Sequence, residues 1–252
     1  MMQITPTVKQ LLIINILVYI GSQIVGAEAY RMLSLFYFES PNFQPWQPLT
    51  HMFMHAAFPN ITHILFNMFA LYSFGSALEH FWGGKKFLFF YISCGLGAAA
   101  LQLLFNYFTI QQGLDLLAAH GFDMTESMAL LQGGSTQKSL DAVDMNVLRD
   151  AYGALNGPMV GASGAIYGLL VAFAFMFPNA ELALLFIPIP IKAKYFVPAI
   201  IGIDLFLGFK GQSIFGAGGT GIAHFAHVGG ALVGFLMMWY WKKNQFNGNR
   251  WN

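Results

Sequence analysis

Six long runs of apolar residues, each bounded by charged residues, proline or polar clusters, dominate the sequence. Most have close to the ~20 residues that a helix needs to cross the roughly 30 Å hydrocarbon layer of a membrane. The fifth run is the shortest. The pattern therefore predicts transmembrane helices with these approximate bounds: Lys9–Gly26, Asn60–Leu78, Phe87–Phe108, Val160–Phe177, Tyr195–Phe209 and His224–Trp241.

The first run also has features of a signal peptide. It begins at Lys9, continues through an apolar core and ends near the small residues of Gly26-Ala27-Glu28-Ala29. Its apolar stretch is longer than the ~7–15 residues of a usual signal-peptide core. We therefore expect the run to be kept as a transmembrane helix, with cleavage as the alternative.

The composition agrees with a membrane protein. Of the 252 residues, 56% are hydrophobic and only 23 are charged, as 12 Lys+Arg and 11 Asp+Glu, whereas a soluble domain of this length would carry roughly 63 charges. The net charge of +1, without a basic run, argues against nucleic acid as a partner. The predicted fold class is all-α: a polytopic membrane protein with a six-transmembrane-helix bundle, in which residues 1–252 form a single domain.

The distribution of lysine and arginine predicts the orientation of the bundle. Six spans put both termini on one side, with eight basic residues there and four on the other side. The positive-inside rule then places both termini in the cytoplasm, and we expect a bacterial inner membrane. The eight are Lys9, Lys85, Lys86, Lys192, Lys194, Lys242, Lys243 and Arg250, and the four are Arg31, Lys138, Arg149 and Lys210.

The connection at residues 111–158 is unusually long for a compact bundle and would be external. Its apolar spacing predicts short amphipathic helices around Leu114–Ala119 and Leu140–Tyr152, separated by the breaker Gly133-Gly134-Ser135. We interpret the connection as a solvated insertion on the membrane surface. A role in admitting substrate or binding a partner is the alternative.

Polar residues inside a membrane span each need a partner or a purpose. In the second span, His63 and Asn67 are four residues apart and share a helix face, from which both can donate hydrogen bonds toward one point. The fourth span begins with Gly161-Ala162-Ser163-Gly164. This puts a serine among the free N–H groups and positive dipole of a helix start, where an oxyanion would be stabilised.

The sixth span begins near His227, whose neutral imidazole is a suitable general base for the Ser163 hydroxyl. Both helices carry glycines four residues apart, a pattern that lets helices approach closely and would bring the base within reach of the hydroxyl. Taken singly, the His63 and Asn67 pair and the Gly161-x-Ser163-Gly164 pattern are each better explained by helix packing. The glycine pairs are Gly164 with Gly168, and Gly230 with Gly234.

No carboxylate within the spans is obviously placed to orient His227. Tyr167, one turn after Ser163, would do so by stacking its ring on the imidazole, which gives a dyad rather than a triad. Asp204, in the fifth run, is an unexplained acid, for which we expect a hydrogen bond that stabilises the bundle.

Together these elements resemble the rhomboid intramembrane serine proteases. The resemblance covers roughly residues 46–100 and 156–240, and it rests on three motifs in this order: His63-x-x-x-Asn67, Gly161-x-Ser163-Gly164 and Ala223-His224-x-x-His227-x-x-Gly230. It implies a rhomboid-like fold and the hydrolysis of peptide bonds in or near the transmembrane segments of substrate proteins. By this resemblance no metal or other cofactor is used, and the partners are transmembrane protein substrates and membrane lipid.

The resemblance also implies catalytic roles for individual residues. Ser163 would be the nucleophile that forms an acyl-enzyme, and His227 would be its general base. Asn67 and His63, together with the Ser163 N–H, would hold the oxyanion of the tetrahedral intermediate.

Supporting roles follow from the same resemblance. Tyr167 matches the family's aromatic residue packed on the catalytic imidazole, and Gly161 and Gly164 flank the nucleophile. Many rhomboids carry a Trp-Arg pair in the first external connection, where this chain has Trp46-Gln47. The missing arginine puts in doubt any contact that it makes to lipid headgroups or to the fold of the loop. His51 and His55 follow, at family positions that support the loop and the site.

Three other hypotheses remain open. His224 and His227 share a helix face and, with Asp204 nearby, would suit a metal ion, although no His-Glu-x-x-His motif is present. A catalytically inert rhomboid-like protein would bind transmembrane helices without cutting them, but such relatives usually lack the serine or the histidine. A transporter with a histidine relay predicts repeated halves, which the sequence does not show.

Overall fold

The structure is a computed structural model that describes residues 3–140, 143–184, 187–210 and 222–245. Arg250, and residues 141 and 142 of the helix predicted at Leu140–Tyr152, lie outside the described residues.

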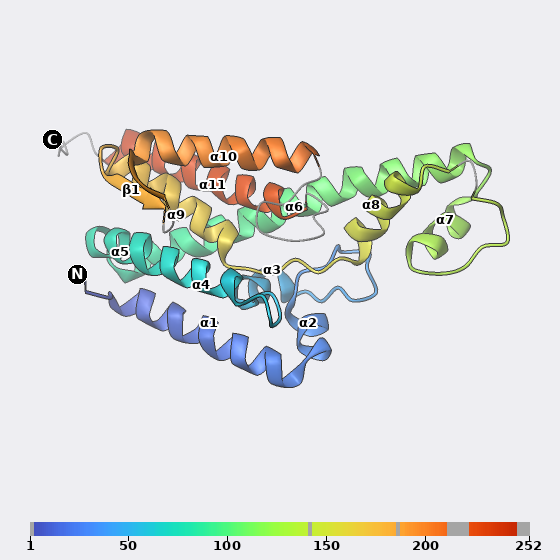
Figure 1. Ribbon diagram of the computed structural model, residues 1–252, viewed down its shortest axis with the longest axis horizontal. Coiled ribbons are helices and arrows are strands. Elements are labelled where there is room, and N and C mark those ends of the chain that lie inside the picture. The colour runs from blue at the N-terminus through green and yellow to red at the C-terminus, as the bar shows by residue number, and fades with distance from the viewer. Residues whose placement is uncertain (1–2, 141–142, 185–186, 211–221, 246–252) are drawn as a thin grey trace.

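The described helices form a bundle in which the apolar runs lie side by side (Figure 1). Three segments are long and apolar enough to cross a membrane, namely Pro6–Val25, Ile61–Trp82 and Gly84–Ala119, and Ser163–Met176 is a shorter apolar helix. The chain is therefore an integral membrane protein of the all-α class, as predicted. The six runs correspond to α1 (Pro6–Val25), α4 to α5 (Ile61–Trp82), α6 (Gly84–Ala119), α9 (Ser163–Met176), α10 (Ala193–Lys210) and α11 (Ile222–Gln245).

The second span is not a uniform α-helix. α4 (Ile61–Ala70) passes into a π-helical turn, η2 (Leu71–Gly75), and continues as α5 (Ser76–Trp82). A Cβ atom on Gly75 would lie 3.0 Å from Val8 Cγ2 and 3.2 Å from Phe87 Cζ. The second span therefore lies directly against α1 and α6.

Short elements that the sequence analysis did not predict complete the described fold. A two-residue contact, in which Leu35 and Met159 exchange backbone hydrogen bonds of 2.9 and 2.8 Å, joins the first connection to the segment before α9. This contact brings the first connection beside the start of α9. The short elements are α2 (Ala27–Leu33), α3 (Gln47–Thr50), the 3₁₀ turn η1 (His51–Phe53) and the antiparallel strands β1 (Glu181–Leu184) and β2 (Ile187–Lys192).

The 111–158 connection is a folded lobe at one end of the molecule (Figure 1). Leu114–Ala119 is helical, but it is the end of α6, which continues without a break beyond the third span's predicted end. α7 (Met124–Leu131) was not predicted, and α8 (Met145–Asn156) covers most of the second predicted helix. Both pack on the projecting end of α6 through their own apolar cluster, so the lobe is an extension of that helix.

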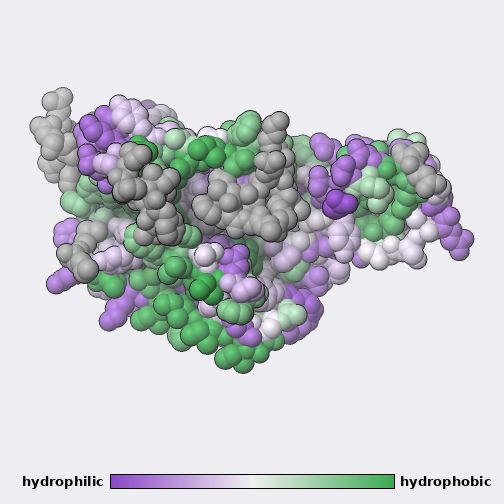
Figure 2. Space-filling view, in the orientation of Figure 1, coloured by the Kyte–Doolittle hydropathy of each residue, from purple (hydrophilic) through white to green (hydrophobic). Residues whose placement is uncertain are grey.

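The outside of the bundle is hydrophobic over α1 and its neighbours, whereas hydrophilic residues gather at the left-hand end and on the α7 lobe (Figure 2). α1 buries Val8 and Leu11 in the core and turns Leu17 and Ile24 outward, with 62% and 80% of their surface exposed. Exposed apolar faces of this size suit contact with lipid. α1 thus packs as part of the bundle.

Glu79, a buried acid near the end of the second span, binds the start of α1. Its carboxylate accepts hydrogen bonds from the Thr5 hydroxyl and from the backbone N–H groups of Thr7 and Val8, the latter two at 2.9 and 2.8 Å. These N–H groups have no partner within their own helix, and a negative charge there suits the helix dipole. Glu79 therefore has a structural explanation.

α9 and α11 touch backbone to backbone at their glycines. A Cβ atom on Gly230 would lie 1.8 Å from the Gly164 carbonyl oxygen, and one on Gly234 would lie 2.8 Å from Gly168 Cα. On another side, a Cβ atom on Gly168 would lie 2.3 Å from Cys94 Sγ of α6. The glycine pairs noted in the sequence thus form the contact between the fourth and sixth spans.

We expect Gly230→Ala to destabilise the protein strongly. Its Cβ would fall far inside the ~3.5–4.0 Å of a favourable contact, so α9 and α11 would have to separate, at a cost of about 1–3 kcal/mol or more. Thermal unfolding in detergent measures this effect. Gly21→Ala is the matched control, because no atom lies within 4 Å of its new Cβ. Equal midpoints for the two variants would contradict the close contact.

Candidate active site

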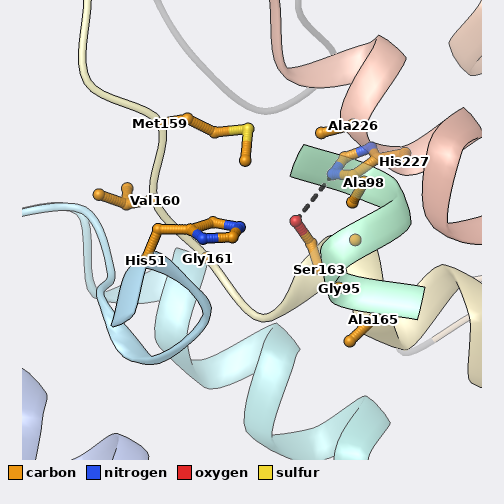
Figure 3. A pocket seen from close by; sticks show the side chains of 11 residues that line it. His51, Gly95, Ala98, Met159, Val160, Gly161, Ser163, Ala165, Ala226 and His227 are labelled. Atoms are coloured by element: carbon orange, nitrogen blue, oxygen red, sulfur yellow. Dashed lines mark hydrogen bonds between the residues drawn. The ribbon is translucent and has the colours of Figure 1, made fainter. Parts of the chain in front are cut away.

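Ser163 and His227 meet across the contact between α9 and α11 (Figure 3). Ser163 Oγ lies 2.9 Å from His227 Nε2. Just before the helix, Gly161 has a φ of +128°, which residues with side chains rarely adopt, and its N–H donates to the His51 carbonyl oxygen at 2.9 Å. This turn lets the chain enter α9 with the serine as its first residue.

A small pocket opens in front of the serine and the imidazole (Figure 3). Its walls come from the first connection, α6, the segment before α9, α9 itself and α11. His51 lies across the pocket from Ser163, and Met159 lies beside it. The hydroxyl is therefore accessible to a small group from one side.

The start of α9 gives the pocket a positive electrostatic character. The first hydrogen bond within the helix runs from the Ile166 N–H to the Ala162 carbonyl oxygen, at 3.0 Å. The N–H groups of Ser163 and the two residues after it precede this bond, so they have no partner within the helix. Together with the helix dipole, they favour negative charge beside Ser163 Oγ.

Tyr167 lies one turn further along α9 and stacks on His227. The two ring centroids are 4.3 Å apart and the planes differ by 10°. Stacking at this distance fixes the plane of the imidazole. The structure thus brings together Ser163, His227 and Tyr167, with Gly161 and Gly164 in the pocket wall.

His63 directs a donor toward the same space. The Ala56 N–H donates to His63 Nδ1 at 3.0 Å, so Nδ1 carries no proton and the proton of the ring is on Nε2. A Cβ atom on Gly161 would lie 3.0 Å from His63 Nε2 and 3.4 Å from Ser163 Oγ. The glycine therefore leaves a space that a small atom can occupy in contact with both groups.

Asn67 is buried one turn after His63. It is not among the described residues that line the pocket. Its Nδ2 donates to the His63 carbonyl oxygen at 2.7 Å. One of the two amide hydrogens is therefore directed to the helix backbone, and the second remains for another acceptor.

Asp204 corrects the expectation that no carboxylate faces the imidazole. Its Oδ2 lies 3.1 Å from His227 Nδ1, and its Oδ1 is hydrogen-bonded to His224 Nδ1. Only 1% of the residue's surface is exposed. The sequence signal was a lone acid in an apolar run. The distances along the chain do not show which face of α10 is turned toward α11, so the sequence did not reveal the contact.

The same contact joins the residues that the sequence analysis considered for a metal ion. The ligand atoms of Asp204, His224 and His227 lie within 4.8 Å of one another. Each imidazole presents Nδ1 to one carboxylate oxygen. The cluster is therefore complete as a set of hydrogen bonds, while its residue types would also suit a divalent cation.

Gln47 accounts for the departure in the first connection. Its side chain is fully buried, and Nε2 donates to the carbonyl oxygens of Arg31 and Asn42 at 3.1 and 2.9 Å, while Oε1 accepts from the Phe36 N–H at 3.3 Å. Beside it, Trp46 Nε1 donates to the Met32 carbonyl oxygen at 2.9 Å. A neutral amide thus holds the fold of this loop without an arginine.

Comparison with known proteins finds matches to one family. A family model described as Rhomboid domain matches residues 42–121 and 128–244. The chain is 24% identical over 186 residues to Rhomboid protein 1, mitochondrial, of Saccharomyces cerevisiae, covering 72% of this chain and 38% of the relative. It is 27% identical over 205 residues to Rhomboid protease AarA of Providencia stuartii, covering 76% and 54%. The chain thus spans about half or less of each of these two relatives.

Two buried histidines in the first connection stay neutral. Burial lowers the pKa of His51 to about 4 and the pKa of His55 to about 3. His51 Nδ1 is hydrogen-bonded to the Gln47 carbonyl oxygen at 3.0 Å. The His55 ring nitrogens have no hydrogen-bond partner among the described residues, and the ring lies 5.3 Å from that of His63. Both rings support the loop as uncharged groups.

The buried state of His55 predicts acid lability. The unfolded chain binds a proton at this residue below about pH 6.5, whereas the folded chain does not until about pH 3. The contribution of His55 to the free energy of unfolding is therefore constant above about pH 6.5. It decreases as the pH falls, by about 2–3 kcal/mol near pH 4.5. His55→Phe removes the titration without breaking a hydrogen bond within the described chain. Its unfolding midpoint should decrease less between about pH 7 and pH 4.5 than that of the wild type, and parallel profiles would contradict the assignment.

Proposed function

Because the chain belongs to the rhomboid family, we propose that it is an intramembrane serine protease that hydrolyses peptide bonds in or near transmembrane segments. The observation that carries the proposal is the 2.9 Å contact between Ser163 Oγ and His227 Nε2, inside a pocket at the start of α9. A hydroxyl that donates to an imidazole in this way is the pairing that nucleophilic catalysis needs. The relative from Providencia stuartii is named a protease, which supports the same reaction.

The proposed reaction passes through an acyl-enzyme. Ser163 Oγ attacks the carbonyl carbon of the scissile bond while its proton moves to His227 Nε2, and the carbonyl oxygen becomes an oxyanion. The intermediate then expels the amine, which takes the proton from Nε2. A water molecule, deprotonated by the same imidazole, hydrolyses the ester and returns Ser163 to its starting state.

The proposed oxyanion donors are the Ser163 N–H, His63 and Asn67. The Nε2–H of His63 borders the space beside Gly161 that is also in reach of the serine oxygen. Asn67 would use its second amide hydrogen, since the first is bonded to the His63 carbonyl oxygen. Donors fixed before the reaction stabilise the developing charge more than water does.

The proposed partners are transmembrane protein substrates and the surrounding lipid, with no metal or other cofactor. We propose that residues 1–252 form one membrane domain. We also propose that both termini face the cytoplasm, because α1 begins and α11 ends at the same end of the bundle (Figure 1) and Lys242 and Lys243 lie in the last turn of α11. A bacterial inner membrane is the expectation from sequence alone. The relative from Saccharomyces cerevisiae is named mitochondrial, so the comparisons do not support that choice of compartment.

Ser163→Ala and His227→Ala should each abolish cleavage of a single-span test substrate in proteoliposomes, because each removes a group that exchanges the proton. A fluorophosphonate probe should label the wild type at Ser163 and leave Ser163→Ala unlabelled. Thermal unfolding of each variant tests whether it is folded. Near-normal turnover in either folded variant would refute the role of that residue, and a wild type that binds substrate without cutting it would indicate an inert relative.

His63→Ala and Asn67→Ala should slow the reaction by removing oxyanion donors. For each we expect kcat to fall by about 10²–10³-fold, with a smaller change in KM. Steady-state kinetics in proteoliposomes measure both constants. Thr62→Ala is a control on the same helix, since Thr62 is exposed and its hydroxyl donates to Asn60 Oδ1. A change in KM of about 10²–10³-fold with no change in kcat would exclude the oxyanion role.

A further inference from the structure

We propose that Asp204 is the positioning residue for His227, so that the site works as a Ser163–His227–Asp204 triad rather than a dyad. The inference rests on the proposed function, and it goes beyond it by assigning the fifth span a part in the chemistry. It follows from a line of contacts that runs from the Ser163 hydroxyl through the imidazole to the Asp204 carboxylate.

The imidazole proton of His227 must be on the nitrogen that faces Asp204. Ser163 Oγ lies 2.9 Å from Nε2 and can transfer a proton only if Nε2 is unprotonated. The proton of the neutral ring must then be on Nδ1. Asp204 Oδ2 lies 3.1 Å from Nδ1 and accepts that hydrogen bond. The carboxylate therefore stabilises the one tautomer of His227 that can act as a base.

Asp204 is itself held in place by hydrogen bonds. Its other oxygen is hydrogen-bonded to His224 Nδ1, and the Tyr167 hydroxyl is a further hydrogen-bond partner. Side chains of both Asp204 and His224 are at most 5% exposed. A buried carboxylate in a membrane span is costly unless its oxygens are satisfied. These contacts satisfy them and leave the carboxylate a single orientation toward His227.

α10 and α11 approach each other closely beside Asp204. A Cβ atom on Gly208, one turn after Asp204, would lie 3.2 Å from His224 Cβ and 3.2 Å from the Phe225 ring. α10 and α11 are therefore as close here as the side chains of α11 permit. This approach brings the short Asp204 side chain within hydrogen-bond distance of two histidines on α11.

The carboxylate also suits the reaction itself. When Ser163 gives its proton to Nε2, His227 becomes an imidazolium with protons on both nitrogens. Asp204 remains ionised and keeps its hydrogen bond to Nδ1–H, so the positive charge forms beside an existing negative charge. Tyr167 fixes the plane of the ring by stacking, and Asp204 fixes its rotation and its tautomer. The two residues have complementary roles.

A divalent cation held by the same three residues makes the opposite demand on the imidazole. A metal ion bound to Nδ1 of His227 would displace its proton to Nε2, and the ring would no longer accept the proton of Ser163. The hydrogen-bonded arrangement and the metal site therefore exclude each other during catalysis.

The test compares Asp204→Asn with Asp204→Glu in proteoliposomes. Asparagine keeps the shape of the side chain and loses the charge, whereas glutamate keeps the charge and adds a methylene. The triad predicts that Asp204→Asn lowers kcat by at least about 10²-fold with little change in KM, given the ~10⁴-fold loss known for the same change in a soluble triad. It also predicts that Asp204→Glu retains more kcat than Asp204→Asn. The reverse order, or an Asp204→Asn kcat within about threefold of the wild type, would overturn the proposal.

Glu79→Gln is the matched control. It makes the same change from acid to amide at a second buried carboxylate with several hydrogen-bond donors, at the start of α1. Its unfolding midpoint should fall while kcat below that temperature stays at the wild-type value. If both variants lose kcat in proportion to stability, Asp204 has only a structural role. If Ser163→Ala keeps activity, the proposed function fails instead, so the two failures are distinguishable.

Two measurements test the proposal on the wild-type protein itself. In protein labelled with ¹⁵N-histidine, the His227 signals, assigned by comparison with His227→Gln, should show protonated Nδ1 and unprotonated Nε2 near pH 8. A proton on Nε2 would contradict the proposal. Cleavage should also survive treatment with EDTA or 1,10-phenanthroline, and loss of activity that zinc restores would favour the metal site and overturn the triad.

Discussion

The contact between the backbones of α9 and α11 is the constraint on which the site depends. Gly230 approaches the Gly164 carbonyl oxygen so closely that a methyl group has no room between them. Ser163 and His227 each lie at the start of this contact on their own helix. Their side chains are short, so a separation of even one side-chain layer would break the 2.9 Å bond between the hydroxyl and the imidazole. The close packing of α9 and α11 is therefore a condition for the contact between Ser163 and His227.

The polar groups inside the bundle show how a membrane protein can hold charge at low cost. Glu79 binds the free N–H groups at the start of α1, and Asp204 binds two imidazoles of α11. In hydrocarbon each carboxylate would be strongly disfavoured without such partners. Glu79 therefore joins the second span to α1, and Asp204 joins α10 to α11. Both acids fix the relative position of neighbouring spans, but only Asp204 does so beside the pocket.

Much of this arrangement could be predicted from the sequence, because apolar run length and glycine spacing are local properties. They gave an apolar helix for each of the six predicted runs, three of them long and apolar enough to cross a membrane, and the facing glycines of α9 and α11. The lobe was only partly predicted, since α6 continues past Phe108 into residues whose apolar pattern also fits a separate helix. Asp204 was considered near His227 only as a metal ligand, and its hydrogen bond to the imidazole was not predicted, because this bond depends on the rotation of α10, which no local pattern encodes. The buried Gln47 shows the same limit, as its backbone partners are brought together only by the folded loop.

Trapping the covalent intermediate tests the central claim most directly. A single-span substrate would be mixed with excess enzyme in proteoliposomes, quenched in acid within the first turnover and examined by mass spectrometry of the peptides. The account predicts that the amino-terminal half of the substrate is attached through an ester to Ser163. Cleavage that proceeds at the normal rate without any adduct on Ser163, with water attacking the peptide bond directly, would contradict it.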